Sequence, residues 1–225
     1  GCIALESIPA GLFDKCTEVT EFYETFENCR NIKEIPAGLF DKCTEVEDFG
    51  SCFASCVALT AIPQGLFDNN TKVTTFGGTF ENCESITEIP AGLFDNCTEV
   101  TNFAGVFQRT KITAIPAGLF KNNTKAEWFG SAFYYCSMLQ SVPAGLFDNC
   151  TKALGFRYTF GFCTMLTGES PYTTINVNSE DKKVHLYERS LYPEYFTAPT
   201  SYGGCFFNSS GLTDYTDMPV EWKNN

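Results

Sequence analysis

The heptapeptide Ile8–Asp14, IPAGLFD, decides the fold because variants of it return at almost constant spacing along the chain. The other five copies are Ile35–Asp41, Ile62–Asp68, Ile89–Asp95, Ile115–Lys121 and Val142–Asp148. The prolines of successive copies lie 27, 27, 27, 26 and 27 residues apart. A period in this range predicts a solenoid, because one unit cannot bury its apolar face alone and must stack on its neighbours.

Each unit divides into two similar halves, since a Phe recurs every 13 or 14 residues from Phe13 to Phe160. Segments rich in β-branched residues, such as Val19–Phe22 and Ile32–Ile35, predict two short strands per coil. Segments such as Gly11–Cys16 predict single helical or 3₁₀ turns at the corners, where the Gly two residues after each Pro permits a bend. The expected fold class is an α/β repeat in which short parallel strands stack into ladders.

The regular pattern has one defect and one end. The fourth repeat lacks a residue between Thr110 and Ile112, which predicts a local bulge or kink. After Leu166 the repeat stops, and the alternation over 175–188 on both sides of a polar turn predicts a β-hairpin. A degenerate half-repeat follows at 206–219. We therefore expect a solenoid over residues 1–168 and a capping unit over residues 169–225 that covers its last coil.

The chain also starts inside a repeat, because Cys2, Leu5 and Ile8 already follow the pattern. We therefore expect it to be a piece of a longer protein.

Ten of the twelve cysteines fall near or in two columns when positions are counted from the proline of each repeat. The column seven residues after the proline holds Cys16, Cys43, Asn70, Cys97, Asn123 and Cys150. The column twenty residues after it holds Cys29, Cys56, Cys83, Thr110, Cys136 and Cys163, with Cys2 ahead of the first repeat. Small residues that replace one another in this way predict an inward-facing ladder, whose polar members bond turn backbone that would otherwise be unsatisfied.

Geometry favours free thiols over disulfides in these columns. Stacked coils lie ~4.8 Å apart, so parallel side chains have a Cβ–Cβ gap longer than the ~3.8 Å of a disulfide. Cys52 and Cys205 fall outside both columns, and the sequence leaves open whether they pair.

Composition and motifs exclude several function classes. The net charge of −12 argues against a nucleic-acid partner, and no apolar run approaches the ~18–20 residues of a membrane helix. The chain has one histidine, His185, and no motif of a nucleophile, a phosphate loop or a zinc site. The Asp five residues after most repeat prolines is better explained as a turn residue than as a cation ligand. We expect no enzymatic activity, no cofactor and no metal.

The outward positions differ between repeats, and binding by a solenoid uses such variable positions. The first three repeats present acids and small polar groups there. The last two present the candidate ligand-binding residues Trp128, Tyr134, Tyr135, Arg157, Tyr158 and Phe162.

Two explanations of this cluster remain. It could be an aromatic patch that binds a protein or a glycan. Alternatively, the Tyr-rich segment 172–200 covers it as part of the cap, which the rise in aromatic density near that segment favours. Burial of Trp128, Tyr135 and Tyr158 by that segment would exclude the patch.

The segment Phe94–Phe103, FDNCTEVTNF, followed by F-x-x-C-x-x-[LI]-T-x-[IV]-P, resembles the BspA-like leucine-rich-repeat proteins of bacterial cell surfaces. The resemblance covers about residues 2–168 and the half-repeat, although Phe fills the columns where leucine-rich repeats usually have Leu. Leu166–Tyr172 and Lys183–Arg189 also resemble endings of such proteins from intestinal bacteria. The resemblance implies a leucine-rich-repeat-type solenoid and carries no catalytic residues.

The same resemblance implies a secreted or surface-anchored bacterial protein. We therefore expect a non-enzymatic protein that mediates protein–protein interaction or adhesion, with a protein or glycan on a host or neighbouring cell as its partner. The alternative is a glycan-binding module that uses the aromatic cluster. In both cases we expect no nucleic-acid partner and no membrane insertion by this fragment.

Overall fold

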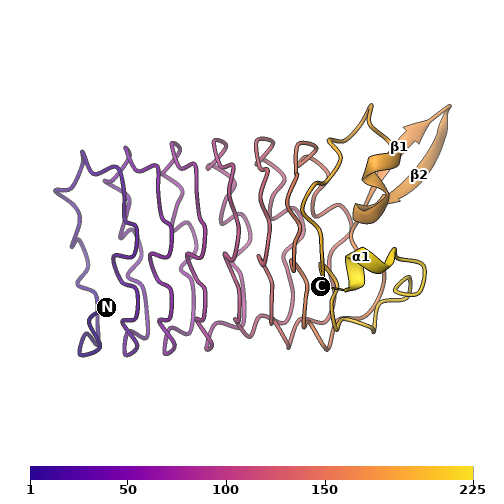
Figure 1. Cartoon of the computed structure of the whole chain (residues 1–225). Coiled ribbons are helices and arrows are strands. Elements are labelled where there is room, and N and C mark those ends of the chain that lie inside the picture. The colour runs from indigo at the N-terminus through magenta and orange to yellow at the C-terminus, as the bar shows by residue number, and fades with distance from the viewer. Residues whose placement is uncertain (225) are drawn as a thin grey trace.

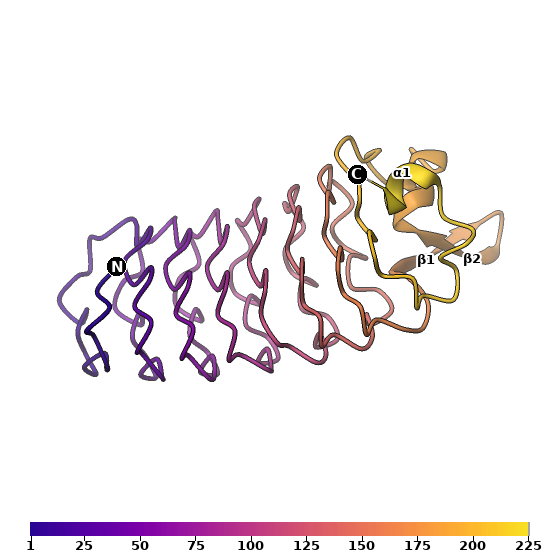
Figure 2. The ribbon, with the colours of Figure 1, turned by 60° about the horizontal axis from the view of Figure 1, so that its bottom comes forward.

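The structure, a computed structural model that describes residues 1–224, is a row of stacked coils with a cap at its C-terminal end (Figure 1). The row forms a gently curved rod, as a second view shows (Figure 2). The repeated coils predicted from the sequence are therefore present. The regular elements are β1 (Tyr172–Val177), β2 (Glu180–His185), the 3₁₀ helix η1 (Leu186–Leu191) and α1 (Val220–Lys223), and all four lie in the cap.

The predicted strands and helical turns within the coils are wrong in detail. Neighbouring coils are joined by single-residue parallel bridges, and within residues 1–171 neither a strand nor a helix forms. Six of these bridges follow one column, and they link Glu21, Asp48, Thr75, Asn102, Trp128, Gly155 and Ser201 in turn. The second predicted strand, such as 32–35, has no such bridge except in the last coil, where Gly168 bridges to Leu212 of the cap.

Left-handed residues explain why the coils contain turns instead. In the first coil Glu24 and Asn28 have φ of 53° and 58°, and the equivalent residues of later coils are also left-handed. The amides of Phe22 and Glu24 donate to the next coil, to Asp48 O at 2.8 Å and Gly50 O at 2.9 Å. The amides of Thr25 and Glu27 instead donate to the carbonyl three residues earlier in the same coil, and each closes a turn. Because two left-handed residues stand four positions apart in this part of each coil, neither a helix nor a strand continues through it.

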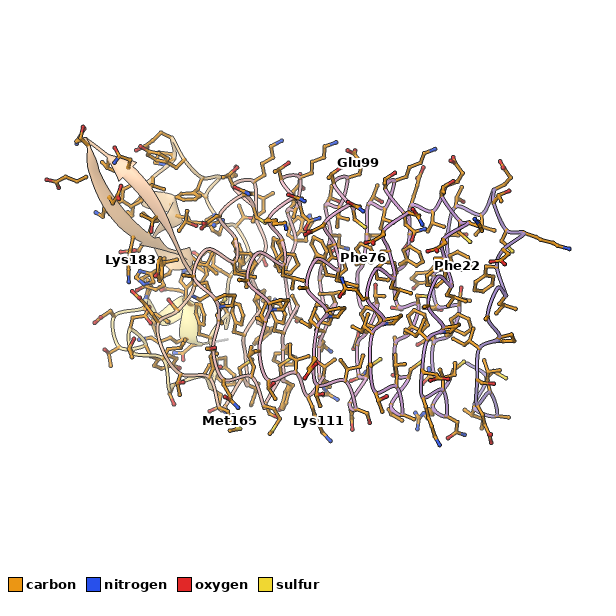
Figure 3. The ribbon with its side chains drawn as sticks, turned by 180° about the vertical axis from the view of Figure 1, so that it is seen from behind. Phe22, Phe76, Glu99, Lys111, Met165 and Lys183 are labelled. Carbon is orange, nitrogen blue, oxygen red and sulfur yellow. The ribbon has the colours of Figure 1, made fainter. Side chains whose placement is uncertain are left out.

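Columns of Phe rings fill the interior of the rod, where Phe22 and Phe76 lie between the coils (Figure 3). Rings of neighbouring coils stack, as Phe76 does on Phe103 with centroids 6.0 Å apart. Rings of the two halves of one coil meet at a tilt, as Phe67 and Phe76 do at 4.7 Å. A fully buried Phe contributes ~1.5–3 kcal/mol, so these columns are the largest apolar contribution to stability.

The predicted inward ladders are confirmed. The Cys56 thiol donates to Phe26 O of the preceding coil at 3.1 Å. In the other ladder the Asn70 amide stands where neighbouring coils have a Cys, and it donates to Phe40 O at 3.2 Å and Cys43 O at 2.8 Å. Across residues 1–224 all twelve cysteines are free thiols. Cys52 and Cys205 are both buried, and they stand in a third inward column that also contains Thr79 and Thr159.

We expect the ladder thiols to be unreactive in the folded protein. Burial raises the pKa of Cys56, Cys97 and Cys136 to about 12, so their thiolates are absent at neutral pH. A colorimetric disulfide reagent at pH 8 should label only Cys2, which is exposed, and Cys16, which is half-buried. After denaturation in guanidinium all twelve thiols should react. Rapid labelling of further thiols in the native protein would contradict the buried ladders.

The shortened fourth coil takes a more direct path instead of forming the bulge expected from the sequence. In the fifth coil the Leu139 amide donates to Cys136 O at 3.0 Å and closes an outward turn. The fourth coil lacks this turn, and the Lys111 amide donates directly to Ile86 O of the preceding coil at 2.9 Å. The chain therefore takes a shorter path, and the missing turn leaves a gap in an otherwise continuous row of turns.

The cap covers the two halves of the last coil with two different segments. The predicted hairpin is present, but it begins at Tyr172 and ends at His185, with Asn178 and Ser179 both at positive φ in its two-residue turn. Beyond it, the fully buried Arg189 donates to Cys150 O at 2.9 Å and Phe147 O at 2.8 Å. Its guanidinium thus continues the Cys and Asn ladder.

The predicted half-repeat covers the other half of the last coil. The amides of Phe156 and Phe160 donate to Ser201 O and Cys205 O, as between full coils. The Ser209 hydroxyl continues the second ladder by donating to Phe160 O at 2.6 Å. Nowhere in residues 1–224 is there a helix long and apolar enough to cross a bilayer.

Candidate functional site

The C-terminal aromatic cluster is open to solvent, so the expectation that the segment 172–200 covers it is wrong. Trp128 is 41% exposed and Tyr135 is 38% exposed, while Tyr158 is half-buried. The segment instead bonds the opposite half of the last coil, where the Thr197 amide donates to Thr151 O. We call the exposed cluster the aromatic surface, which comprises Trp128, Tyr134, Tyr135, Arg157, Tyr158 and Phe162.

Ring contacts join most of the aromatic surface into one unit. Tyr135 stacks on Phe162 of the next coil, with centroids 4.3 Å apart and an interplanar angle of 10°. Tyr134 meets Tyr135 edge-on at 4.8 Å and Tyr158 at 5.3 Å. Burial raises the pKa of the Tyr134 phenol, which therefore remains a neutral hydrogen-bond donor. These contacts hold the rings in fixed positions before any ligand arrives.

Two arginines flank the rings. The Arg157 guanidinium lies 5.2 Å from the Tyr158 centroid, and the Arg109 guanidinium lies 5.3 Å from the Tyr135 centroid. A guanidinium held over a ring is oriented by the cation–π attraction and keeps its N–H groups available at its edge.

Glycines of the next coil make room for three of these rings. A Cβ built on Gly155 would lie 2.4 Å from the Trp128 indole. A Cβ on Gly161 would lie 3.1 Å from Tyr134, and one on Gly204 would lie 2.6 Å from Tyr158. Each ring therefore lies against bare backbone at the equivalent position one coil further on.

The aromatic surface is costly for the scaffold. Tyr135, Tyr158 and Phe162 have φ of 57° to 60°, in the left-handed region. The same columns elsewhere hold mainly Asn, Ser and Gly, which adopt this conformation more readily. A bulky residue there costs roughly 1–2 kcal/mol. These three aromatic residues therefore depart from the residue types that the left-handed columns hold elsewhere.

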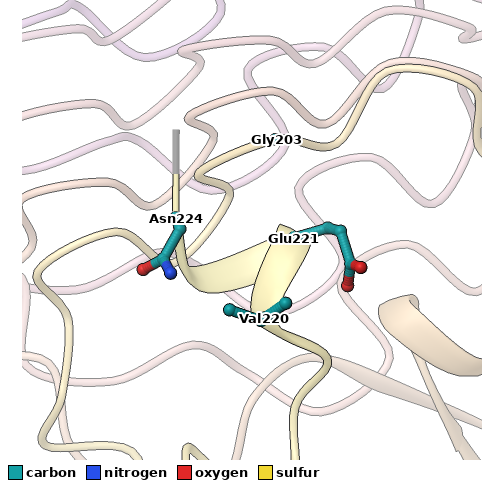
Figure 4. Close-up of a pocket in the computed structure, with 4 residues that line it drawn as sticks. All are labelled: Gly203, Val220, Glu221 and Asn224. Carbon is teal, nitrogen blue, oxygen red and sulfur yellow. The ribbon is translucent and has the colours of Figure 1, made fainter.

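The surface hollows near the C-terminal half include two of similar volume. One has a volume of about 350 Å³ and lies where the fourth coil lacks its turn. We call it the notch, and its lining residues are Glu84, Arg109, Thr110, Lys111, Tyr135 and Ser137. The other, of about 370 Å³, lies beside α1 and is lined by Gly203, Val220, Glu221 and Asn224 (Figure 4). Its described lining offers one charged group and no aromatic ring.

The single histidine joins parts of the cap. His185 Nδ1 lies 3.1 Å from Glu188 and Nε2 lies 3.2 Å from Glu169. The nearby Ser170 hydroxyl donates to Asp214 at 2.6 Å instead of to the imidazole. A serine nucleophile is activated by a hydrogen bond from its hydroxyl to the general base. This cluster lacks that bond, so it does not form a hydrolytic triad.

The acidic and sulfur side chains do not converge on a cation. Among the described residues, no group of three or more His, Cys, Asp or Glu side chains is arranged to hold a metal ion. In the Asp column, Asp95 pairs with Lys121 at 2.8 Å. The Asp side chains fold back over the turn glycines, as Asp14 does over Gly11.

The structure adds two residues to those that the sequence singled out. Phe207 of the half-repeat meets Phe162 edge-on at 5.1 Å and extends the aromatic surface toward the cap. Arg109 stands in the same left-handed column as Tyr135, one coil earlier. Its signal in the sequence was a cation in a column of mostly Asn and Ser, whereas Phe207 lies beyond the point where the period stops.

Comparison with known proteins gives structural likenesses only. No protein-family model and no curated protein matches the chain. Similar solved structures include the APL1 leucine-rich repeat domain, which is 15% identical with a TM-score of 0.42 over 77% of this chain and 38% of that one. A chain of the LRIM1/APL1C complex is 16% identical with a TM-score of 0.44 over 62% of this chain and 26% of that one.

A third likeness is to the leucine-rich repeat domain of APL1B, which is 14% identical with a TM-score of 0.34 over 52% of this chain and 34% of that one. The chain thus spans between 26% and 38% of the length of these solved chains.

Proposed function

We propose that this chain is a non-enzymatic binding module, a divergent leucine-rich-repeat-type solenoid that contacts another protein through the aromatic surface. The observation that carries the proposal is that the exposed Tyr135 and the half-buried Tyr158 and Phe162 occupy left-handed positions where other coils hold mainly Asn, Ser or Gly. Trp, Tyr and Arg are also the residues that dominate the energy of protein interfaces. The rings are held in place before binding, so little side-chain entropy is lost on contact.

Reversion of the aromatic surface to the residues of the preceding coil should abolish partner binding. Trp128→Asn introduces the residue type of Asn102, and Tyr158→Ser introduces that of Ser131, each from the same column one coil earlier. Both residue types already occupy these positions in the scaffold, so the fold should be kept. Against purified extracellular-matrix proteins measured by surface plasmon resonance, each variant should lose affinity by about tenfold or more, as expected for a hot-spot residue.

Two further variants separate the surface from the fold. Gly155→Ala should lower the affinity for the same partner. The added methyl group displaces the Trp128 indole but leaves Trp128 itself unchanged. Gly130→Ala is the matched control, since its Cβ would meet its nearest atom at an ordinary 3.5 Å, and it should leave the affinity unchanged. If a partner binds and the three other variants all retain its affinity, the aromatic surface is not the contact.

A second candidate is a glycan-binding module that uses the same half of the rod. The flat seating of Trp128 on Gly155 favours it, because the indole is supported by the backbone of the next coil and remains 41% exposed. A glycan array probed with the wild type and with Trp128→Asn would distinguish this candidate from the protein-contact proposal.

We further propose that the protein acts outside a bacterial cell or on its surface, in adhesion to a host or neighbouring cell. The resemblance of Phe94–Phe103 to surface repeat proteins supports this placement. Buried free thiols such as Cys97 and Cys136 are compatible with an oxidising environment, because burial raises their pKa values and the thiolate is the species that is oxidised.

A further inference from the structure

We propose that the notch binds a carboxylated sugar unit of a glycan. The inference rests on the glycan candidate and not on the protein-contact proposal, so either can fail alone. It adds a place and a ligand class that the aromatic surface by itself does not specify.

The notch exists because of the one-residue deletion. Five other coils close an outward turn here, as Ile86 does by donating to Cys83 O at 3.1 Å. The fourth coil has no such turn, so the turns on either side become walls and Thr110 and Lys111 become the floor. Lys111 points outward from the same long edge of the rod as Met165 (Figure 3). A volume of about 350 Å³ lies within the ordinary range of small-ligand sites.

The notch carries two cations that stand outside the ion pairs of the rod. Elsewhere Lys72, Lys121 and Lys125 each pair with an acid of the preceding coil. Within residues 1–224 neither Arg109 nor Lys111 forms an ion pair. Two such cations two residues apart are unexpected in a chain of net charge −12.

The Arg109 guanidinium is positioned for a planar anion. It ends a stack of side chains that runs through Tyr135 to Phe162, at 5.3 Å and then 4.3 Å between centres. Arg109 is itself left-handed, with φ of 56°, where the preceding coil has Asn82. A guanidinium fixed in this way presents a fork of N–H groups that matches a carboxylate in two parallel hydrogen bonds.

The remaining lining distinguishes a sugar acid from other anions. The exposed Glu84 carboxylate would repel a phosphate or a purely acidic peptide side chain. With the Ser137 hydroxyl it offers acceptors for a ligand that carries hydroxyl donors as well as its charge. A pyranose with a carboxylate has both, so it can place its charge at Arg109 and Lys111 and its hydroxyls at Glu84.

The probe is a tetrasaccharide of alternating uronic acid and N-acetylhexosamine. The control is the same tetrasaccharide with its carboxyl groups reduced to alcohols. In isothermal titration the carboxylated form should bind about tenfold or more tightly than the reduced form, as expected for a charge-assisted pair.

Three variants test the residues. Arg109→Asn and Lys111→Gln should each lower the affinity for the carboxylated probe by about tenfold. The first of them restores the residue type of Asn82. Insertion of a Ser between Thr110 and Lys111 should restore the turn, fill the notch and abolish binding. Lys72→Gln removes the same charge from a paired site and should leave the affinity unchanged.

Three results would overturn the inference: equal affinity for the reduced probe, unchanged affinity in Arg109→Asn, or equal competition by inorganic phosphate or a tetraglutamate peptide. Binding of neutral glycans that depends on Trp128 but not on Arg109 would refute the notch while leaving the glycan candidate intact.

Discussion

Arg189→Met should destabilise the protein by about 2–3 kcal/mol, because it removes two charge-assisted hydrogen bonds to the buried carbonyls of Phe147 and Cys150. Burial lowers the pKa of the Arg189 guanidinium to about 10, so the native side chain is charged at neutral pH. It also stacks on Phe196 at 4.5 Å. Loss of the unfavourable buried charge offsets part of the lost hydrogen bonding, which keeps the expected effect below that of a broken ion pair.

Urea denaturation gives the size of the effect, and hydrogen exchange gives its location. Protection should fall first in the last full coil, where the ladder ends at Phe147 O and Cys150 O. The central coils should keep their protection at low denaturant, because each coil contacts only its neighbours. Arg30→Met is the control, since Arg30 is exposed and should change stability by less than about 0.5 kcal/mol. Equal effects of the two substitutions would show that Arg189 does not secure the cap.

Phe94→Ala should have the largest effect of any single truncation that we consider, about 3–5 kcal/mol. Phe94 is fully buried, and its ring contacts five others: Phe67, Phe76, Phe103, Phe107 and Phe120. The cavity cannot collapse easily, because the Cys97 thiol ties this coil to Phe67 O and the Asn123 amide ties the next coil to Phe94 O. Thermal or urea unfolding measures the loss.

Phe13→Ala is the matched comparison for Phe94→Ala. Phe13 holds the same place in the first coil, but it is only partly buried and contacts three rings. Its truncation should cost roughly half as much, since less apolar surface is removed from contact. Similar losses at both positions would argue against the idea that stacking on two sides determines the contribution of each Phe.

The period and the identity of the inward columns could be predicted from the sequence, because both depend on residues that repeat. The ladders of Cys56 and Asn70 were recognisable because Cys, Asn and Thr replace one another at equivalent positions of successive repeats. The β-branched runs predicted strands, but Val19–Phe22 forms only the single bridge at Glu21, and the left-handed Glu24 ends the extended chain just beyond it. Glu is not a residue that signals positive φ, so single-residue patterns could not show this.

The site was only half predictable. The aromatic residues stood out because they differ from their columns, but their exposure depended on where the segment 172–200 packs. That path is set by the buried Arg189, a single residue outside the repeats that no periodic pattern identifies. The missing turn at Lys111 was visible as a 26-residue step, yet its result was a notch and not a bulge, because the Lys111 amide found Ile86 O as a partner.

The alignment of the bonds between coils also has a mechanical consequence. Amides such as Phe22 and Glu24 donate to the next coil, so these bonds run along the rod. Tension between the two ends of the rod loads them directly, and the coils peel away one at a time instead of shearing together. A released coil of 27 residues adds up to about 90 Å of slack before its neighbour bears the load. The number of coils, more than the strength of any one, then sets how far the protein extends before it fails.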